Sequence, residues 1–138
     1  MKYFTISELT RSATAARLGI DNTPSPQIRK NLETLINTVL DPLREAWGAP
    51  IIVTSGYRCP KLNKAVGGSK TSQHAYGQAA DIKTVGDKRE NNKKLFELAK
   101  KLIDEGKIVV GQLIDEYGYD WVHISTQGGH KNQILHIK

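Results

Sequence analysis

The chain has 138 residues, a length that suits one domain with one hydrophobic core, and its 38% hydrophobic and 25% charged residues are ordinary for a globular protein. Its single cysteine excludes an internal disulfide, and no run approaches the roughly 18 apolar residues of a membrane span. Lysine and arginine outnumber aspartate and glutamate by 20 to 14, and the net charge of +6 favours an acidic partner such as nucleic acid, an anionic lipid surface or cell wall.

The N-terminal part of the chain is predicted to be mainly helical. A short helix capped by Ser7 is expected near the start, and a longer helix is expected from Pro26, with Pro42 kinking it. A further short helix is expected after Pro60. The long helix is predicted from apolar residues that recur at helical spacing: Ile28, Leu32, Leu35, Ile36, Leu40 and Leu43.

Strands and one basic helix are predicted in the rest of the chain. The β-branched run at residues 51–54 indicates a buried strand, and the segment 67–76, rich in glycine, serine and threonine, indicates a loop. Lysines alternate with an apolar stripe over residues 88–103, which is typical of a helix with a solvated basic face. We therefore expect an α+β fold, in which helices pack on one face of a small antiparallel sheet, with further strands at residues 79–84, 112–115, 121–125 and 133–137.

Two imidazoles and one carboxylate have the composition of a catalytic zinc site. These are His74 in the predicted loop, Asp81 in a predicted strand and His123 in another. Side chains alternate along a strand, so Asp81 and His123 can share the polar face away from the helices, with His74 closing over it. A lone histidine is more often an isolated polar residue, but this trio favours a metal site. Three protein ligands would leave the fourth zinc position open for a water.

Three motifs together resemble the zinc D-Ala-D-Ala metallopeptidases, which group with lysostaphin-type enzymes and the hedgehog signalling domain. The motifs are Ser55-Gly-Tyr-Arg58, then Ser72-x-His-x-x-Gly-x-Ala-x-Asp81, then Trp121-x-His123. Within that group the sequence is most similar to the small phage and bacterial peptidoglycan peptidases, and the likeness covers about residues 5–137. The combination of motifs is specific, whereas each motif alone is a weak signal.

The resemblance implies a role for each matching residue. His74, Asp81 and His123 match the zinc ligands of the family. Arg58 matches an arginine that contacts the substrate and stabilises the oxyanion, a task that suits a permanently charged planar donor, although an arginine can also be structural. Ser72 matches a substrate-binding serine, while its hydroxyl suits a bond to loop backbone equally well.

The general base is predicted to be Asp120, because the family places a carboxylate three residues before the last histidine. The base must lie within hydrogen-bond reach of the attacking water. Residues three apart in a regular strand point to opposite faces, so Asp120 must lie in a turn or bulge, which the preceding Tyr117-Gly-Tyr119 favours. Glu116, a longer side chain across the same turn, is the alternative.

Two other histidines and the cysteine are predicted to lie outside the ligand set. His130 follows a Gly-Gly turn and is expected to be exposed. His136 is expected to orient a metal ligand through a hydrogen bond. Cys59 is expected to be a small buried residue rather than a nucleophile.

The resemblance implies a single zinc peptidase domain over residues 1–138 that hydrolyses an amide of the peptidoglycan stem peptide. The best match is a phage-type endolysin, an L-alanyl-D-glutamate endopeptidase; the alternatives are a D-alanyl-D-alanine carboxypeptidase and a non-catalytic zinc or peptidoglycan-binding module. We expect a monomer with no nucleic-acid partner and no stable membrane association. The first residues lack the apolar core of a signal peptide, so we expect synthesis in the cytoplasm and action on the cell wall, in the periplasm, after release.

Overall fold

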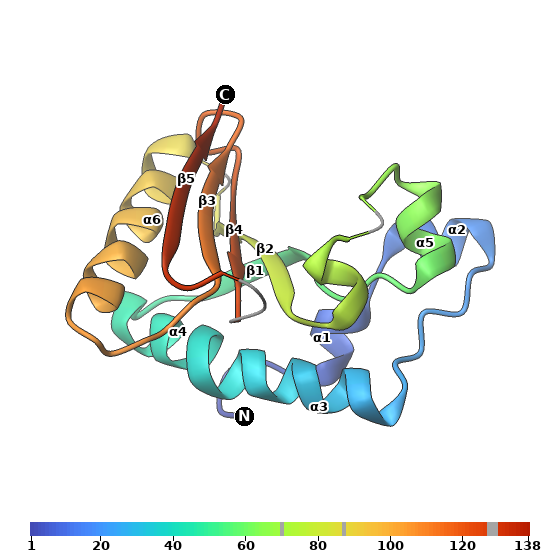
Figure 1. Ribbon diagram of the computed structural model, residues 1–138. Coiled ribbons are helices and arrows are strands. Elements are labelled where there is room, and N and C mark those ends of the chain that lie inside the picture. The colour runs from blue at the N-terminus through green and yellow to red at the C-terminus, as the bar shows by residue number, and fades with distance from the viewer. Residues whose placement is uncertain (70, 87, 127–129) are drawn as a thin grey trace.

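A five-stranded sheet with helices around it forms the fold of the computed structural model, which describes residues 1–69, 71–86, 88–126 and 130–138 (Figure 1). The strand order is β1-β2-β4-β3-β5, and all neighbours are antiparallel except β3 and β5, which are parallel. The predicted α+β class is confirmed, with one parallel pair in the sheet that was expected to be antiparallel. The elements are α1 (Ile6–Thr10), α2 (Ala13–Leu18), α3 (Pro26–Leu35), η1 (Ile36–Leu40), α4 (Asp41–Trp47), β1 (Ile51–Ser55), α5 (Pro60–Ala65), η2 (Gln73–Tyr76), β2 (Ala79–Thr84), α6 (Arg89–Asp104), β3 (Gln112–Glu116), β4 (Trp121–Ser125) and β5 (Gln133–Ile137).

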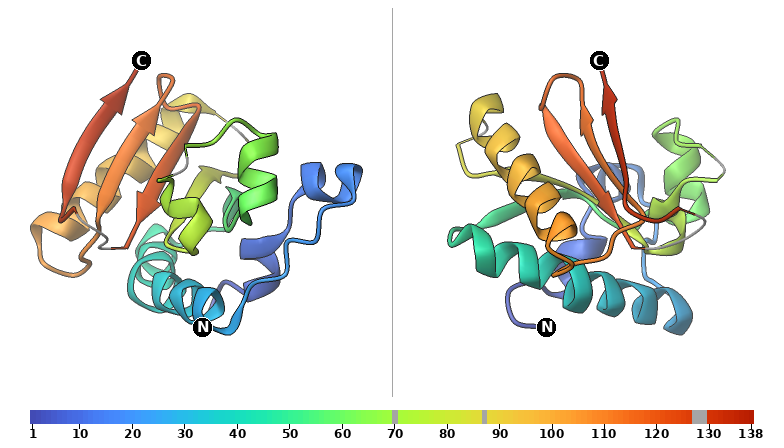
Figure 2. Two further views of the ribbon diagram at one scale, coloured as in Figure 1. Left: turned by 45° about the vertical axis from the view of Figure 1, so that its right-hand side comes forward. Right: turned by 60° about the vertical axis from the view of Figure 1, so that its left-hand side comes forward.

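Helix α6 covers one face of the sheet, and α3 and α4 run beneath one end of it (Figures 1 and 2). On β2, β3 and β4, apolar residues on the covered face are buried in the core, as the alternation in the sequence predicts. Asp81 and His123 alternate with these core residues along β2 and β4. No helix among the described residues is long and apolar enough to cross a membrane. The core residues of β2, β3 and β4 are Ala80, Ile82, Leu113, Val122 and Ile124.

The helix predicted from Pro26 is present, and its expected kink takes the form of a π-helical turn. Ser25 caps the helix by accepting a hydrogen bond from the Ile28 backbone N–H at 3.3 Å. The π turn, η1, ends just before Pro42, whose ring has no N–H and crowds the preceding turn, so a wider turn relieves the clash. The predicted apolar stripe packs inward, and five of its residues have no exposed surface: Leu32, Leu35, Ile36, Leu40 and Leu43.

The start of the first helix differs from its prediction. Thr5, not Ser7, is the N-cap: its backbone is extended and its hydroxyl accepts from the Glu8 N–H at 3.2 Å. The prediction of Ser7 is wrong because Ser7 lies inside α1, where the hydroxyl cannot cap the first turn. Helix α2, capped by Ser12, was not predicted, since six residues are too few to show a helical apolar period.

Asn92 is a fully buried polar side chain that joins α6 to the sheet. Its Oδ1 accepts from the Thr84 N–H and from the Thr84 hydroxyl, both at 2.9 Å. Its Nδ2 donates to the carbonyls of Tyr119 at 2.9 Å and Asp120 at 3.2 Å. One side chain therefore links β2 to the turn that leads into β4, the two strands that carry Asp81 and His123.

Replacing Asn92 by alanine is expected to lower the free energy of unfolding by about 2–4 kcal/mol, because buried donors and acceptors on β2 and the turn lose their partner. Urea unfolding followed by circular dichroism measures this loss. Asn91→Ala, at the partly exposed neighbouring position, is the matched control and should change stability by less than about 0.5 kcal/mol. Equal effects of the two substitutions would contradict the role given to Asn92.

Candidate metal centre and active site

The three predicted ligands meet at one point of the structure. Both His74 Nε2 and His123 Nδ1 approach the same oxygen, Asp81 Oδ1, at 3.3 Å and 3.1 Å. One ligand atom from each residue lies within 4.8 Å of the others, and the two imidazole rings meet edge to face with centroids 5.2 Å apart. The arrangement has the size and the donor types of a metal site.

Each ligand is positioned by a different element. Asp81 in β2 lies directly opposite His123 in β4, so the antiparallel register brings these two side chains together. His74 lies on η2, a 3₁₀ turn within the segment that was predicted as a loop. The Ser72 hydroxyl caps this turn by accepting from the His74 N–H at 3.2 Å, and Gly77 ends it with a left-handed φ of 69°.

The hydrogen bonds of His74 indicate whether a cation fits between His74 and Asp81. His74 Nδ1 lies 2.8 Å from the Gly56 carbonyl, which can only accept, so this nitrogen carries the proton. Nε2 then presents a lone pair to the Asp81 carboxylate, and two acceptors at 3.3 Å repel each other unless a proton or a cation lies between them. Two nitrogens and one oxygen suit zinc. Among the described residues no fourth histidine, cysteine or carboxylate joins the set, which is the composition of a catalytic rather than a structural site.

Asp81 is prepared to bind a cation. Burial alone raises the pKa of its carboxyl, but the imidazoles of His123 and His74, when protonated, outweigh that effect through hydrogen bonds and charge and hold the pKa well below its ordinary value. The carboxylate therefore stays ionised, which a metal ligand requires.

Arg58 lies beside the cluster, as its motif predicts. Its Nη2 donates to Ser72 Oγ at 3.2 Å, and its backbone N–H donates to the His74 carbonyl at 3.0 Å. Burial lowers the pKa of Arg58, while the Asp81 and Glu116 carboxylates raise it, so the guanidinium is within electrostatic reach of the site. Ser72 thus holds the His74 turn and the arginine together. Its contact with substrate stays a prediction.

Gly56, to which the sequence analysis gave no role, anchors His74 through its carbonyl. A Cβ added to Gly56 would lie 2.2 Å from the Leu9 carbonyl oxygen, so the end of α1 leaves room for glycine only. The next residue, Tyr57, donates its backbone N–H to Leu9 at 2.7 Å. A glycine directly after a strand was the available signal. The prediction that this strand is buried is wrong, because β1 lies at the edge of the sheet and exposes Ile52.

Asn22 is a second positioning residue that the sequence analysis missed. Its Nδ2 donates to the Tyr57 carbonyl at 2.9 Å, and its Oδ1 accepts from the Cys59 N–H at 2.8 Å. These two bonds hold the backbone on both sides of Arg58. In the sequence, Asn22 lies in Asp-Asn-Thr-Pro and resembles an ordinary turn residue, so no local signal distinguished it.

Glu116 occupies the face of the sheet that carries the cluster. It ends β3 opposite Trp121, and Ile114, two residues earlier, lies opposite His123. Alternate residues of a strand share a face and are separated by about 7 Å, a distance that a glutamate side chain can largely span. Partial burial and the negative charge of Asp81 raise the pKa of Glu116. The effect of Asp81 on this pKa shows that the two carboxylates are close enough to interact.

Asp120 lies in the turn before β4, as its prediction required. Tyr117 and Tyr119 in this turn have left-handed φ angles of 53° and 66°. The Asp120 carboxylate is 3.8 Å from both Lys83 Nζ and Arg89 Nη2, so two cations surround it. Its role as the general base stays a prediction, as does that of Glu116.

The raised pKa of Glu116 has a consequence for stability without metal. The folded protein holds this proton more tightly than the unfolded chain does, so ionisation of Glu116 costs stability as the pH rises above about 4. Glu116→Gln should therefore raise the thermal midpoint of the chelated protein at pH 7, and the gain should shrink toward pH 4. Glu97→Gln, at an exposed position on α6, is the control and should show no such gain. A pH-independent gain would contradict this assignment.

Cys59, His136 and His130 were predicted to lie outside the ligand set. Cys59 is buried, as predicted, and its sulfur accepts from the Leu62 N–H at 3.4 Å. The prediction that His136 orients a metal ligand is wrong: it pairs with Asp115 and packs near Phe96 of α6, on the opposite face of the sheet. His130 is exposed, as predicted, whereas the expected turn at residues 128 and 129 lies outside the described residues.

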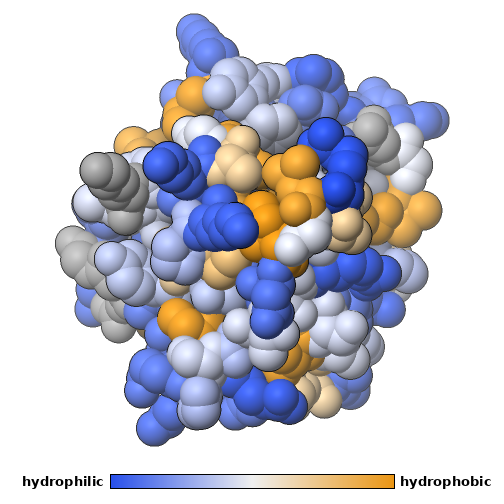
Figure 3. Space-filling view, turned by 90° about the vertical axis from the view of Figure 1, so that its right-hand side faces the viewer, coloured by the Kyte–Doolittle hydropathy of each residue, from blue (hydrophilic) through white to orange (hydrophobic). Residues whose placement is uncertain are grey.

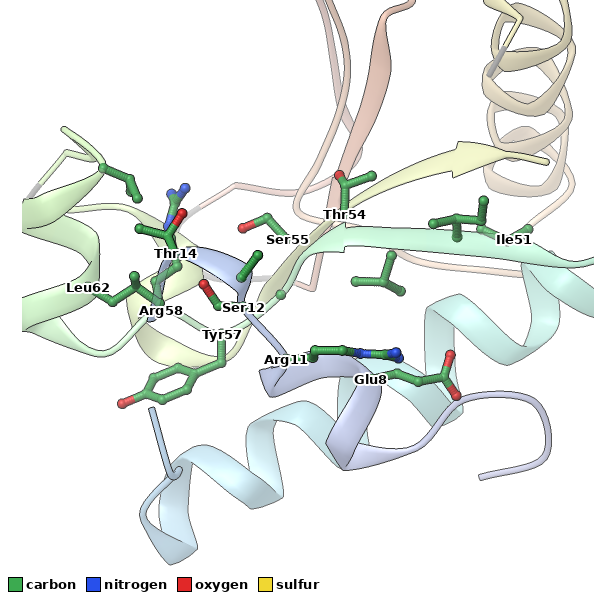
Figure 4. A pocket seen from close by; sticks show the side chains of 15 residues that line it. Glu8, Arg11, Ser12, Thr14, Ile51, Thr54, Ser55, Tyr57, Arg58 and Leu62 are labelled. Carbon is green, nitrogen blue, oxygen red and sulfur yellow. The ribbon is translucent and has the colours of Figure 1, made fainter. Parts of the chain in front are cut away.

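Two grooves lie beside Arg58 and Ser72. The first, of about 630 Å³, lies between α1, the start of α2 and β1, and reaches Arg58 (Figure 4). The second, of about 460 Å³, contains His123 together with hydroxyl and amide side chains. The hydrogen bond from Arg58 to Ser72 joins the two. The second groove is lined by Ser69, Thr71, Ser72, Gln73, Gln112, Ile114, His123 and His130.

An α+β fold in which Asp81 and His123 of the sheet meet His74 of a 3₁₀ turn, with an arginine beside them, has the ligand set of a metal-dependent hydrolase. The chain belongs to the peptidase M15 family, because the family profile matches residues 2–125. This membership implies a metallopeptidase and confirms the resemblance read from the motifs. The matched region contains the metal cluster, Arg58 and both candidate bases, whereas β5 lies beyond it. A search of curated proteins gave no match.

Proposed function

We propose that the chain is a zinc-dependent peptidoglycan endopeptidase of the endolysin type, which hydrolyses the L-alanyl-D-glutamate bond of the stem peptide. The supporting observation is that the His74, Asp81 and His123 cluster lies beside Arg58, which lines one groove, and that Ser72, bonded to Arg58, lines another together with His123. A peptide that occupied both grooves would continue on both sides of the reacting bond, as an endopeptidase requires. A carboxypeptidase needs a closed end that binds a free carboxylate. The net charge of +6 would concentrate the enzyme at an anionic wall.

His74, Asp81 and His123 would hold the zinc ion, which when bound supplies a Lewis acid and a water of lowered pKa. Arg58 donates N–H groups to the carbonyl oxygen of the scissile amide and opposes the negative charge that develops there. Its bond to Ser72 and the backbone bonds of Asn22 hold the guanidinium in place before substrate arrives.

Glu116 is our first choice for the proton carrier. It takes the proton of the attacking water and gives it to the nitrogen of the leaving amine, so that the C–N bond breaks with a neutral amine departing. Its raised pKa brings it closer to the range in which a carboxylate can both accept and return a proton. Asp120 is the second candidate, on the strength of its position three residues before His123.

Mass spectrometry of purified peptidoglycan, digested by the zinc-loaded protein beside a chelated sample, tests the proposal. New alanine carboxyl ends and glutamate amino ends are the expected products. Release of terminal D-alanine alone would instead establish the carboxypeptidase. Absence of any chelator-sensitive product, in protein shown to contain zinc, would leave the non-catalytic zinc or peptidoglycan-binding module as the function.

A further inference from the structure

We infer that the first groove binds the peptide of the substrate as an extended strand added to the free edge of β1, with a carboxylate of that peptide near Arg11. This inference rests on the proposed function. Strand β1 is at the edge of the sheet and pairs only with β2. Among the described residues, no backbone hydrogen bond from another segment reaches the open side of Ile51–Ser55. Such an edge is a template for strand addition.

The groove has the shape that an extended peptide needs. Figure 4 shows Glu8 and Arg11 of the α1 region on one side of β1, with Thr14 near Arg58 at one end. Ile52 on the strand is 45% exposed, so an apolar side chain is available to the bound peptide. The molecule seen from the side of α2 and α5 is largely hydrophilic with small apolar areas between (Figure 3), which suits a peptide of mixed polarity.

Two hydrogen bonds connect the residues of the groove to the candidate active site. Arg58 lines it and also donates to Ser72, which lines the second groove. The Thr54 hydroxyl of β1 donates to the carbonyl of the ligand Asp81 at 3.2 Å, so the edge strand runs directly beside the metal cluster. A peptide paired with β1 would therefore lead to the bond that Arg58 contacts.

The charges of the groove favour an acidic peptide. Its lining contains two guanidinium groups, Arg11 and Arg58, and one carboxylate, Glu8, which leaves one positive charge. Arg58 is proposed to bind the carbonyl of the reacting bond. Arg11 is exposed, so its guanidinium can bind a carboxylate elsewhere on the peptide. The stem peptide supplies one at its glutamate, next to the proposed cleavage site.

Charge reversal tests the side-chain part of the inference. With a soluble disaccharide-tetrapeptide fragment of peptidoglycan as substrate, Arg11→Glu should raise KM about five- to tenfold and leave kcat within about twofold. Arg17→Glu makes the same change of charge on α2, away from the groove, and should leave both constants within about twofold. Equal effects of the two variants, or an unchanged KM in Arg11→Glu, would overturn the role of Arg11.

Amide hydrogen exchange tests the strand pairing independently of catalysis. In chelated wild-type protein, saturation with the same fragment should slow exchange in β1 at least about tenfold relative to free protein, and Arg11→Glu should require more fragment to reach this protection. Unchanged exchange at β1 despite saturation of the site would refute strand addition, even if the enzyme cleaves peptidoglycan. Protection in protein that fails to cleave would support the groove while sinking the proposed endopeptidase.

Discussion

His123→Ala is expected to lose bound zinc and peptidoglycan hydrolysis together. The substitution removes one of three ligand atoms that lie within 4.8 Å of one another, and no other described residue is placed to replace it. Loss of the metal forfeits several kcal/mol of transition-state stabilisation, so kcat/KM should fall by about 10³-fold or more. Zinc content by plasma mass spectrometry and product release from peptidoglycan measure the two losses.

His136→Ala is the matched control for this experiment. His136 pairs with Asp115 on the face covered by α6, so the variant should keep stoichiometric zinc even if it is less stable. Chelation of the wild-type protein should reproduce the His123→Ala result, and added zinc should restore activity only to the wild type. Stoichiometric zinc in His123→Ala, bound as tightly as in the wild type, would remove His123 from the ligand set.

Glu116→Gln is expected to lower kcat by about 10²–10⁴-fold while zinc content stays unchanged. The substitution keeps the size of the side chain on the cluster face but removes the group that accepts and returns a proton. Asp120→Asn should lower kcat by less than about tenfold, because the Asp120 carboxylate is engaged by Lys83 and Arg89. Single-turnover rates with the disaccharide-tetrapeptide fragment separate this loss from substrate binding.

The opposite order of effects would assign the base to Asp120, the position that the family resemblance favours. In that case Asp120→Asn would lose the acidic limb of the pH profile of kcat, whereas Glu116→Gln would retain it. Glu116→Asp is a further control, because it preserves the carboxylate but shortens the side chain. Partial activity in this variant would show that proton transfer depends on the length of the side chain as well as on its carboxylate.

Several features of this protein follow from the sequence by itself, because each depends on a local pattern. The strand alternation around Asp81 and His123 correctly placed their neighbours Ile82, Val122 and Ile124 in the core, since a two-residue period is a property of any strand. The apolar stripe of α6 and the helix from Pro26 were likewise readable from their spacing. The motifs around Arg58 and His74 indicated the family that the profile confirms.

Only the tertiary structure decided the features that depend on contacts between distant segments. The parallel pairing of β5 with β3 and the pairing of His136 with Asp115 are set by strand direction and register, which no local period encodes. Gly56 and Asn22 position the site through close packing with residues far along the chain. Tertiary contacts also set the surroundings of the two candidate bases: Asp120 lies between Lys83 and Arg89, and Glu116 ends β3 opposite Trp121.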